Sequence, residues 1–148
     1  MIKVIRFTFE DKEYADMANA IRRRVFVDEQ GVDPALEYDK EENAHHYLLT
    51  INDKPIATAR WRETEEGIKL ERFAVLSEFR NRGIGEIILK EVMKDVIPLG
   101  KLIYLHSQAR AVPFYERNRF KKEGEIFMEA GIEHYYMKYS YTNVDPAI

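Results

Sequence analysis

The sequence contains no cysteine among its 148 residues. This absence excludes disulfide bonds, cysteine-ligated zinc, iron–sulfur clusters and a cysteine nucleophile, and it is typical of a reducing compartment. Long apolar runs are also absent from the first ten residues, where charged side chains interrupt the apolar ones. Neither a signal peptide nor a membrane span is expected there. We therefore predict a cytoplasmic protein with no membrane partner.

An excess of positive charge is lacking as well, because 23 basic residues stand against 26 acidic ones and leave a net charge of −3. Such a chain has no net attraction to a phosphate backbone, so no nucleic-acid partner is predicted. Hydrophobic residues make up 45% and charged residues 33%, which are ordinary values for a globular protein. With no repeat or low-complexity segment, residues 1–148 are predicted to form a single domain.

The first half of the chain alternates between strand and helix patterns. Val4–Glu10 has the two-residue period of a strand, and residues 13–25 carry apolar side chains at helical spacing. Tyr47–Ile51 and Ile56–Arg62 alternate around a polar turn and predict a hairpin, which Ile68–Leu76 extends into three antiparallel strands.

The second half predicts a parallel strand pair. Ile84–Val96 has the pattern of an amphipathic helix, Lys101–His106 that of a buried strand, and Val112–Asn118 that of a short helix. A strand, a helix and a further strand in succession imply parallel pairing. Glu125–Tyr139 alternates around Glu129-Ala130-Gly131 as a terminal hairpin. The predicted class is α/β (α+β), with a mixed, mostly antiparallel central sheet flanked by helices.

A basic, glycine-containing loop, Arg80-Asn81-Arg82-Gly83-Ile84-Gly85, joins an apolar strand to the following helix. Glycine lets backbone N–H groups approach an anion, and a helix N-terminus adds unpaired donors. A dinucleotide fingerprint is excluded because Ile88 stands in place of its third glycine, and a Walker loop is excluded because Gly-Lys-Ser/Thr is missing. The structural alternative is a tight turn with Gly83 at a positive φ.

In this context, Arg80-x-x-Gly83-x-Gly85 resembles the acetyl-coenzyme-A signature of the GNAT superfamily of N-acetyltransferases. The segment from Gln108 to Phe120 looks like the second conserved block of that superfamily. Val25-Phe26-Val27-Asp28-Glu29-Gln30, Glu37-Tyr38-Asp39 and Gly131-Ile132-Glu133-His134 are similar to its bacterial ElaA-like or YjcF-like subgroup. The resemblance implies a GNAT-like sheet whose one parallel strand pair is splayed at the cofactor cleft.

The resemblance also implies which residues hold acetyl-coenzyme A as the cosubstrate. The strand backbone would pair with the pantetheine arm and supply an oxyanion donor, and these residues are Phe73, Ala74 and Val75. Loop N–H groups would hold the pyrophosphate, and these residues are Arg80, Asn81, Arg82, Gly83, Ile84 and Gly85. Gln108 stands where the family often has asparagine.

Tyr115 falls where the family often places the acid that protonates the departing thiolate. A phenol is protonated at neutral pH and can donate. The alternative role is that of an aromatic ring packed on the preceding strand. Arg119 replaces the family's usual glycine, so the short helix is expected to end with Asn118 in the left-handed conformation.

Transfer to an amine needs a base, because an alkyl ammonium loses its proton only near pH 10.4. Glu71 is the first candidate, since it lies two positions before Phe73 and is expected on the same strand face. An ion pair with Arg62 or Arg72 is the alternative role for this glutamate. His106 and His134 are further candidates for the base.

The acceptor is expected to enter from the opposite side, along a wall that includes Phe26, Glu29, Asp39 and His134, with His106 close by. A small-molecule amine is the predicted acceptor, and a protein lysine or N-terminus is the alternative. Two other hypotheses would explain the same glycine-containing loop. The protein could be a non-catalytic acyl-coenzyme-A-binding protein or a binder of phosphate or nucleotides.

No metal site is predicted, because His45 and His46 point to opposite faces of a strand. A homodimer contact or core packing are two alternatives for a set of late tyrosines, Tyr135, Tyr136, Tyr139 and Tyr141.

Overall fold

The computed structural model describes residues 1–34 and 43–141. The helix α1 continues without a break into η1, a wider π-helical segment. In chain order the helices and strands are β1 (Ile2–Phe7), α1 (Lys12–Arg22), η1 (Arg23–Glu29), β2 (Ala44–Ile51), β3 (Lys54–Glu63), β4 (Ile68–Val75), η3 (Ser77–Phe79), α3 (Ile84–Val96), η4 (Ile97–Leu99), β5 (Ile103–Gln108), η5 (Ala109–Ala111), α4 (Val112–Arg117), β6 (Phe120–Lys122), β7 (Phe127–Glu129) and β8 (Ile132–Tyr139).

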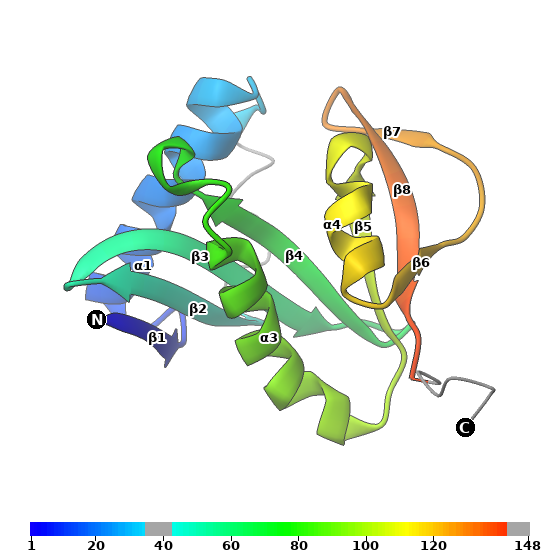
Figure 1. Ribbon diagram of the computed structural model, residues 1–148, viewed down its shortest axis with the longest axis horizontal. Coiled ribbons are helices and arrows are strands. Elements are labelled where there is room, and N and C mark those ends of the chain that lie inside the picture. The colour runs from blue at the N-terminus through cyan, green and yellow to red at the C-terminus, as the bar shows by residue number, and fades with distance from the viewer. Residues whose placement is uncertain (35–42, 142–148) are drawn as a thin grey trace.

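The described strands form one mixed sheet in the order β1-β2-β3-β4-β5-β8-β6, and β7 pairs with β8. Every neighbouring pair is antiparallel except β4 and β5, which are parallel. The predicted fold class is therefore confirmed. Helix α1 lies on one face of the sheet and α3 on the other (Figure 1).

Both predicted hairpins are present, and their turns explain why they form. Asn52 and Asp53 have φ angles of 50° and 67°, and Ala130 and Gly131 have φ angles of 51° and 77°. Two consecutive positive φ angles match the right-handed twist of the flanking strands. The second turn folds β7 back on β8, which decides where Glu129 lies.

Two apolar clusters hold the helices on the sheet. Residues of α3 such as Ile88 and Val92 pack with Leu70 and Leu105 on one face. Residues of α1 and η1 pack with Ala74 on the other face. The helical periodicity of both segments explains this arrangement, because each has one apolar stripe to bury. The late tyrosines Tyr135 and Tyr139 pack against the first cluster, and their proposed dimer contact stays a prediction.

Strand β4 contains a β-bulge. Thr58 pairs with Ala74 and Arg60 pairs with Glu71, so two steps on β3 match three steps on β4. Arg72 is the extra residue, with a φ of 56°. A bulge of this kind shifts the side-chain alternation by one. Phe73 therefore packs with the α3 cluster, whereas Ala74 packs with the α1 cluster. The expectation that Glu71 and Phe73 share a face is wrong for this reason.

The same region separates β4 from β5. The parallel ladder covers only Ile68–Leu70 against Ile103–Leu105. Beyond Leu70 the two strands diverge, and Figure 1 shows the widening space between β4 and the half formed by β5, α4 and β8. The predicted splay of the parallel pair follows from the short ladder and the bend that the bulge introduces.

Candidate active site

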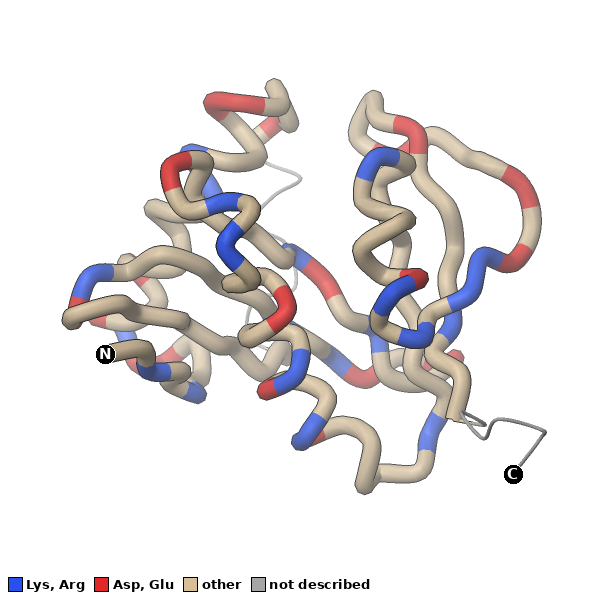
Figure 2. The backbone as a smooth tube through the Cα atoms, in the orientation of Figure 1, with Lys and Arg blue, Asp and Glu red and all other residues tan. Residues whose placement is uncertain are grey.

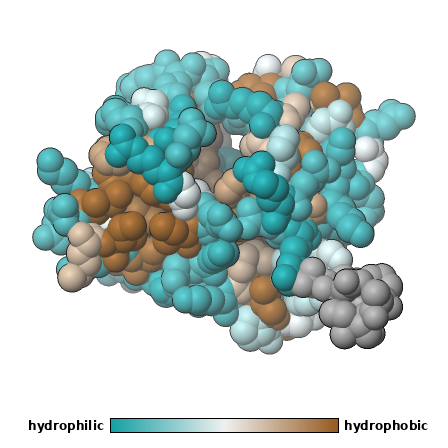
Figure 3. Space-filling model, in the orientation of Figure 1, coloured by the Kyte–Doolittle hydropathy of each residue, from teal (hydrophilic) through white to brown (hydrophobic). Residues whose placement is uncertain are grey.

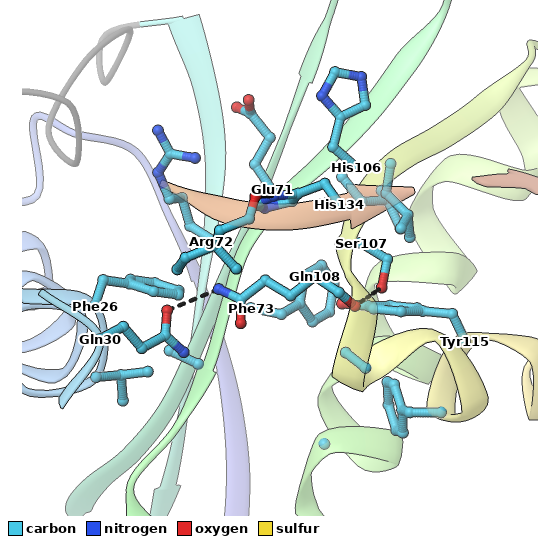
Figure 4. A pocket seen from close by; sticks show the side chains of 18 of the residues that line it. Phe26, Gln30, Glu71, Arg72, Phe73, His106, Ser107, Gln108, Tyr115 and His134 are labelled. Atoms are coloured by element: carbon cyan, nitrogen blue, oxygen red, sulfur yellow. Dashed lines mark hydrogen bonds between the residues drawn. The ribbon is translucent and has the colours of Figure 1, made fainter. Parts of the chain in front are cut away.

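A cavity of about 600 Å³ lies where β4 and β5 diverge. The space-filling view is hollowed between the two halves of the protein (Figure 3). One end is lined by residues from β4 and the α3–α4 side, such as Val75, Gly85 and Phe114. The other end is lined by η1 and the β7–β8 hairpin, including Phe26 and His134. In the close-up in Figure 4, the side chains of Glu71 and His106 point to the same side of the cavity. They point away from the rings of Phe73 and Tyr115.

The loop before α3 forms a helix N-terminus that is open to a ligand. Gly83 has a φ of 76° and is the residue that precedes the helix. Asn81 is also left-handed, with a φ of 63°. In the described part of the chain, no side chain caps the N-terminus of this helix. Ile87 N–H donates a hydrogen bond to Gly83 O one turn earlier. The preceding N–H groups and the helix dipole make a site for an anion.

Gly85 explains why a second glycine follows. A Cβ at this position would lie 3.5 Å from the ring of Phe114 and 4.0 Å from Val75. A larger side chain would therefore project into the space between β4 and α4. The residue keeps the cavity open next to the anion site.

The backbone of β4 presents hydrogen-bonding groups to the cavity. Leu76 N–H donates to Ile56 O on β3, so strand alternation directs the main-chain groups of Val75 and Phe73 the other way, toward the divergent β5. Ala74 pairs with Thr58, so its main-chain groups face β3. Of the three expected strand residues, two therefore present their backbone to the cleft and Ala74 does not.

Arg80 connects the loop to η1. Its Nη1 and Nη2 atoms donate to the two carboxylate oxygens of Glu29, both at 2.9 Å, and its Nε donates to Val75 O at 3.0 Å. A second ion pair joins Arg24 to Glu78 nearby. In Figure 2, basic and acidic positions lie close together at the top of the molecule, where η1 and the loop before α3 approach each other. Glu29 was expected in the acceptor wall, and the structure places it in this pair with Arg80 instead, outside the described cavity lining.

Tyr115 lines the cavity from α4 and is 8% exposed. Its ring contacts Phe73, Phe114 and Phe120 edge-on, with centroid distances of 6.3, 5.0 and 5.8 Å. Burial raises the pKa of the phenol, so the protonated form that can donate is favoured. Both expected roles are compatible with this position, because the ring packs in the core while the residue borders the cavity.

The end of α4 differs from the expectation in its detail. Asn118 has a φ of −108°, and the left-handed residue is Arg119, with a φ of 74°. Arg119 thus adopts the conformation that suits the glycine usual at this place in the resembled family. The left-handed conformation at the end of α4 is therefore present without glycine, and the Cβ of Arg119 makes it a strained one.

Glu71 is the centre of an ion cluster on the sheet. Its carboxylate lies 3.0 Å from Arg60 Nη2, 2.9 Å from Arg62 Nε and 3.2 Å from Lys69 Nζ, and its side chain is 5% exposed. Burial alone would raise the pKa of Glu71, but the three cations outweigh it and hold the pKa at about 2. A carboxylate with this pKa is a weak proton acceptor at neutral pH. The expected ion pair with Arg62 is present, and the environment argues against Glu71 as the base.

At the end of the cavity lined by η1 and the β7–β8 hairpin, where the acceptor is expected, His106 and His134 flank Glu129. His106 Nδ1 lies 2.9 Å from Glu129 Oε1, and His134 Nε2 lies 3.7 Å from Glu129 Oε2. All three line the cavity. The sequence marks both histidines as candidates, but it marks Glu129 only as part of a turn. The signal that could have found it is the two-residue Ala130-Gly131 turn, which places it opposite β8.

Gln108 is at the cavity with its amide engaged. Its Nε2 donates to Gln30 Oε1 at 2.7 Å, which joins the end of β5 to the residue after η1 (Figure 4). The sequence marks Gln30 only as part of the Val25–Gln30 segment that resembles the bacterial subgroup, and the structure places this residue in the cavity lining beside Phe26. The expected wall residue Asp39, together with Glu37 and Tyr38, lies outside the described residues.

No group of three or more His, Cys, Asp or Glu side chains is arranged to hold a metal ion in residues 1–34 and 43–141. None of the helices in the same ranges has the length and apolar character needed to cross a membrane.

Known proteins are similar to this chain in sequence and in fold. Residues 10–141 match the acetyltransferase (GNAT) domain family. The uncharacterized N-acetyltransferase YjcF of Bacillus subtilis is 36% identical over 131 residues, which cover 86% of this chain and 94% of that protein. The crystal structure of Escherichia coli ElaA has a TM-score of 0.84 at 23% identity and covers 95% of this chain and 100% of its own. An aminoglycoside 6′-N-acetyltransferase solved with coenzyme A has a TM-score of 0.74 at 16% identity and covers 92% and 95%.

Proposed function

The chain belongs to the GNAT acetyltransferases and is an acyltransferase, and we propose that it transfers the acetyl group of acetyl-coenzyme A directly to the nitrogen of a small-molecule amine. The observation that carries this proposal is the continuity of two features along the cavity. The open edge of β4 at Phe73 and Val75 leads to the uncapped N-terminus of α3 behind Gly83. A neutral extended amide chain fits the first feature, and a pyrophosphate fits the second.

Each residue has a distinct role in the proposed reaction. Phe73 and Val75 would bind the pantetheine arm through their main chain, and Val75 N–H would stabilise the oxyanion. The N–H groups from Asn81 to Gly85 would hold the pyrophosphate, with Arg80 beside them. The bound cosubstrate supplies an activated acetyl thioester. Tyr115 would donate its proton to the departing sulfur, because burial keeps the phenol protonated.

A small molecule is favoured over a protein chain by the way the acceptor end is enclosed. The Gln30–Gln108 hydrogen bond spans the space between η1 and β5, and Phe26 borders the same opening. An amine of modest size could pass this bridge, whereas an extended peptide would have to displace it. A protein lysine or N-terminus remains the second candidate acceptor.

Ligand-induced stabilisation tests the cosubstrate site. Acetyl-coenzyme A, coenzyme A and adenosine 3′,5′-bisphosphate are titrated in thermal unfolding experiments with the native protein, Gly83→Asp and Gly124→Asp. A ligand at about 100 times its dissociation constant adds roughly 2.7 kcal/mol. The two glycines have φ angles of 76° and 83°, and beyond their chain neighbours no atom of the described residues lies within 4 Å of the place that a Cβ would take. The two variants therefore share the backbone strain and the added charge.

Only Gly83→Asp should lose the stabilisation, and the bisphosphate should stabilise the native protein less than the complete cosubstrate. If no coenzyme-A species raises the unfolding temperature, the proposed cosubstrate site is wrong. If Gly124→Asp loses the effect equally, the loop before α3 is not the anion site.

Turnover separates an enzyme from a binding protein. Thiol release from acetyl-coenzyme A is measured with spermidine, glucosamine, tyramine, kanamycin and Nα-acetyl-lysine as acceptors. Tyr115→Phe should bind acetyl-coenzyme A normally and release thiol about 100-fold more slowly, whereas Tyr14→Phe on α1 should behave as the native protein. Equal rates for native protein and Tyr115→Phe would remove the acid from the proposal.

A further inference from the structure

The acceptor end of the cavity holds a carboxylate between two imidazoles. Glu129 comes from β7, His134 from β8 and His106 from β5, so three strands are needed to bring them together. His106 Nδ1 is 2.9 Å from one oxygen of Glu129, and the side chain of His106 is 25% exposed. Its ring is also held edge-on by Phe127, at a centroid distance of 5.1 Å. The arrangement fixes both the position and the orientation of the imidazole.

The hydrogen-bonding groups decide which nitrogen of each ring carries hydrogen. An ionised carboxylate only accepts, so the contact with Glu129 requires the hydrogen of His106 on Nδ1. The hydrogen bond from His106 outweighs the effect of burial and lowers the pKa of Glu129, which keeps the carboxylate ionised. Nε2 of His106 is then left with a lone pair, and among the described residues no hydrogen bond engages it.

His134 is arranged differently. Its Nδ1 donates to Ile132 O at 2.7 Å, and its Nε2 faces Glu129 at 3.7 Å. Both of its nitrogens are therefore directed at protein atoms. Glu71 is surrounded by three cations. Of the three candidates for the base, only His106 combines a fixed tautomer with a ring nitrogen that has no described hydrogen-bond partner, on a side chain that lines the cavity and is 25% exposed.

We infer that His106 is the catalytic base of the proposed acetyl transfer and that Glu129 is the positioning residue that holds its Nδ1–H tautomer. This inference rests on the proposed function. His106 Nε2 takes one proton from the acceptor ammonium. The neutral nitrogen forms a bond to the acetyl carbon, and collapse of the resulting oxyanion breaks the carbon–sulfur bond as Tyr115 donates its proton to sulfur. The nitrogen then loses its second proton to the Tyr115 phenolate, directly or through water, which restores the phenol. His106 then releases its proton to water, so one proton is produced for each amide.

Several other ionisable groups face His106 or its partner and must be considered in any pH measurement. Glu129 is the closest of these. The others are Arg62 on β3, Lys69 and Glu71 on β4, Tyr104 on β5, and His134 and Tyr136 on β8. Replacing His106 itself is therefore necessary to assign a titration to it.

The tautomer can be measured without knowing the acceptor. Long-range ¹H–¹⁵N NMR spectra of the ¹⁵N-histidine-labelled protein distinguish Nδ1–H from Nε2–H imidazole, and His106→Gln assigns the signal. We expect the Nδ1–H form in the native protein and in Glu133→Gln, and a mixture of tautomers in Glu129→Gln. An Nε2–H form in the native protein, or an unchanged spectrum in Glu129→Gln, would overturn the inference.

Kinetics test the catalytic role with the amine of the panel above that the native protein acetylates fastest. His106→Gln should lower kcat/KM at pH 7 by about 100-fold or more, and Glu129→Gln by at least about tenfold. In His106→Gln, the rate should keep rising with pH until the acceptor ammonium deprotonates near pH 10. His45→Gln and Glu133→Gln, which carry exposed changes away from the cavity, should retain the native rate and pH profile.

The outcomes separate this inference from the proposed function. If the native protein turns over an amine and His106→Gln keeps its rate and pH profile, His106 is not the base, while the acetyltransferase assignment stands. If acetyl-coenzyme A stabilises His106→Gln as it does the native protein, a loss of rate reports on chemistry and not on folding. Absence of turnover with every amine of the panel would overturn both.

Discussion

Replacing Glu71 with glutamine should destabilise the protein strongly while leaving the chemistry largely intact. The carboxylate neutralises Arg60, whose side chain is 1% exposed, together with Arg62 and Lys69. Glutamine keeps the shape and one acceptor oxygen but removes the negative charge. Arg60 keeps its other contacts, yet its buried guanidinium loses the closest described negative charge. The loss of this ion pair determines how far the free energy of unfolding falls.

The expected loss in the free energy of unfolding can be obtained in two independent ways, which agree. Removing one partner of a buried ion pair costs about 3–5 kcal/mol. The fall of the pKa of Glu71 from its usual 4.5 to about 2 corresponds to about 3 kcal/mol of folding free energy by linkage. For a chain of this size, a loss of about 3 kcal/mol lowers the unfolding temperature by roughly 6–12 °C.

The sign of the pH dependence follows from the lowered pKa. The contribution of Glu71 is fully present above pH 4.5, the unfolded value, and is lost as the pH falls toward 2. Urea unfolding at pH 7 and pH 3 measures it. The free energy of unfolding should differ between the native protein and Glu71→Gln by about 3 kcal/mol at pH 7 and by clearly less at pH 3. The control is Glu65→Gln, which removes the same charge at an exposed position and should match the native protein at both pH values.

A difference below about 1 kcal/mol at pH 7 would refute the electrostatic reasoning. Turnover adds a second criterion at a temperature where the variant is folded. If Glu71→Gln binds acetyl-coenzyme A normally but loses 100-fold in rate, the carboxylate is the base after all. A change of less than about tenfold is expected if the cluster only supports the strand.

Three further changes probe the loop, the cavity and α4. Arg119→Gly should raise the free energy of unfolding by about 0.5–1 kcal/mol in urea unfolding, because it relieves a left-handed residue with a Cβ. Gly85→Leu should weaken coenzyme A binding more than tenfold by calorimetry, because its side chain meets Phe114, whereas Gly85→Ala should bind nearly as the native protein does. Glu29→Gln should tighten coenzyme A binding a few-fold at low salt, because Arg80 is released toward the phosphates; weaker binding would show that Glu29 instead positions Arg80.

Local patterns were sufficient for most of the fold. The apolar stripe of Ile84–Val96, the alternation of the strands and the turn residues at 52–53 and 130–131 each depend on neighbours in the chain. The left-handed conformation of Gly83 was also predictable, since glycine is the residue that adopts it at no steric cost. The order strand, helix, strand predicted the parallel pair, and the family resemblance added its splay, which no single segment encodes.

The surroundings of the candidate catalytic groups could not be predicted in the same way. Arg72 and Arg119 adopt positive φ angles that arginine rarely takes, so no local signal marked the bulge in β4 or the true end of α4. The partners of His106 and Glu71 come from other strands, and Glu129 lies 23 residues from His106. Contacts of this kind depend on strand register, which a single sequence specifies only through the complete fold.

The bulge at Arg72 links these corrections into one argument about the base. An unbroken alternation would place Glu71 on the face of Phe73, where the acetyl thioester is proposed to bind. The extra residue follows Glu71, so it turns Phe73 to the α3 face and leaves Glu71 on the other face, where Arg60, Arg62 and Lys69 surround it. On β5, His106 extends to the same side as Glu71 (Figure 4), but its partner is the carboxylate of Glu129 and not a cluster of cations. The proton acceptor is then expected on β5, because β4 at this point supplies its backbone to the cleft and its carboxylate to the stability of the sheet.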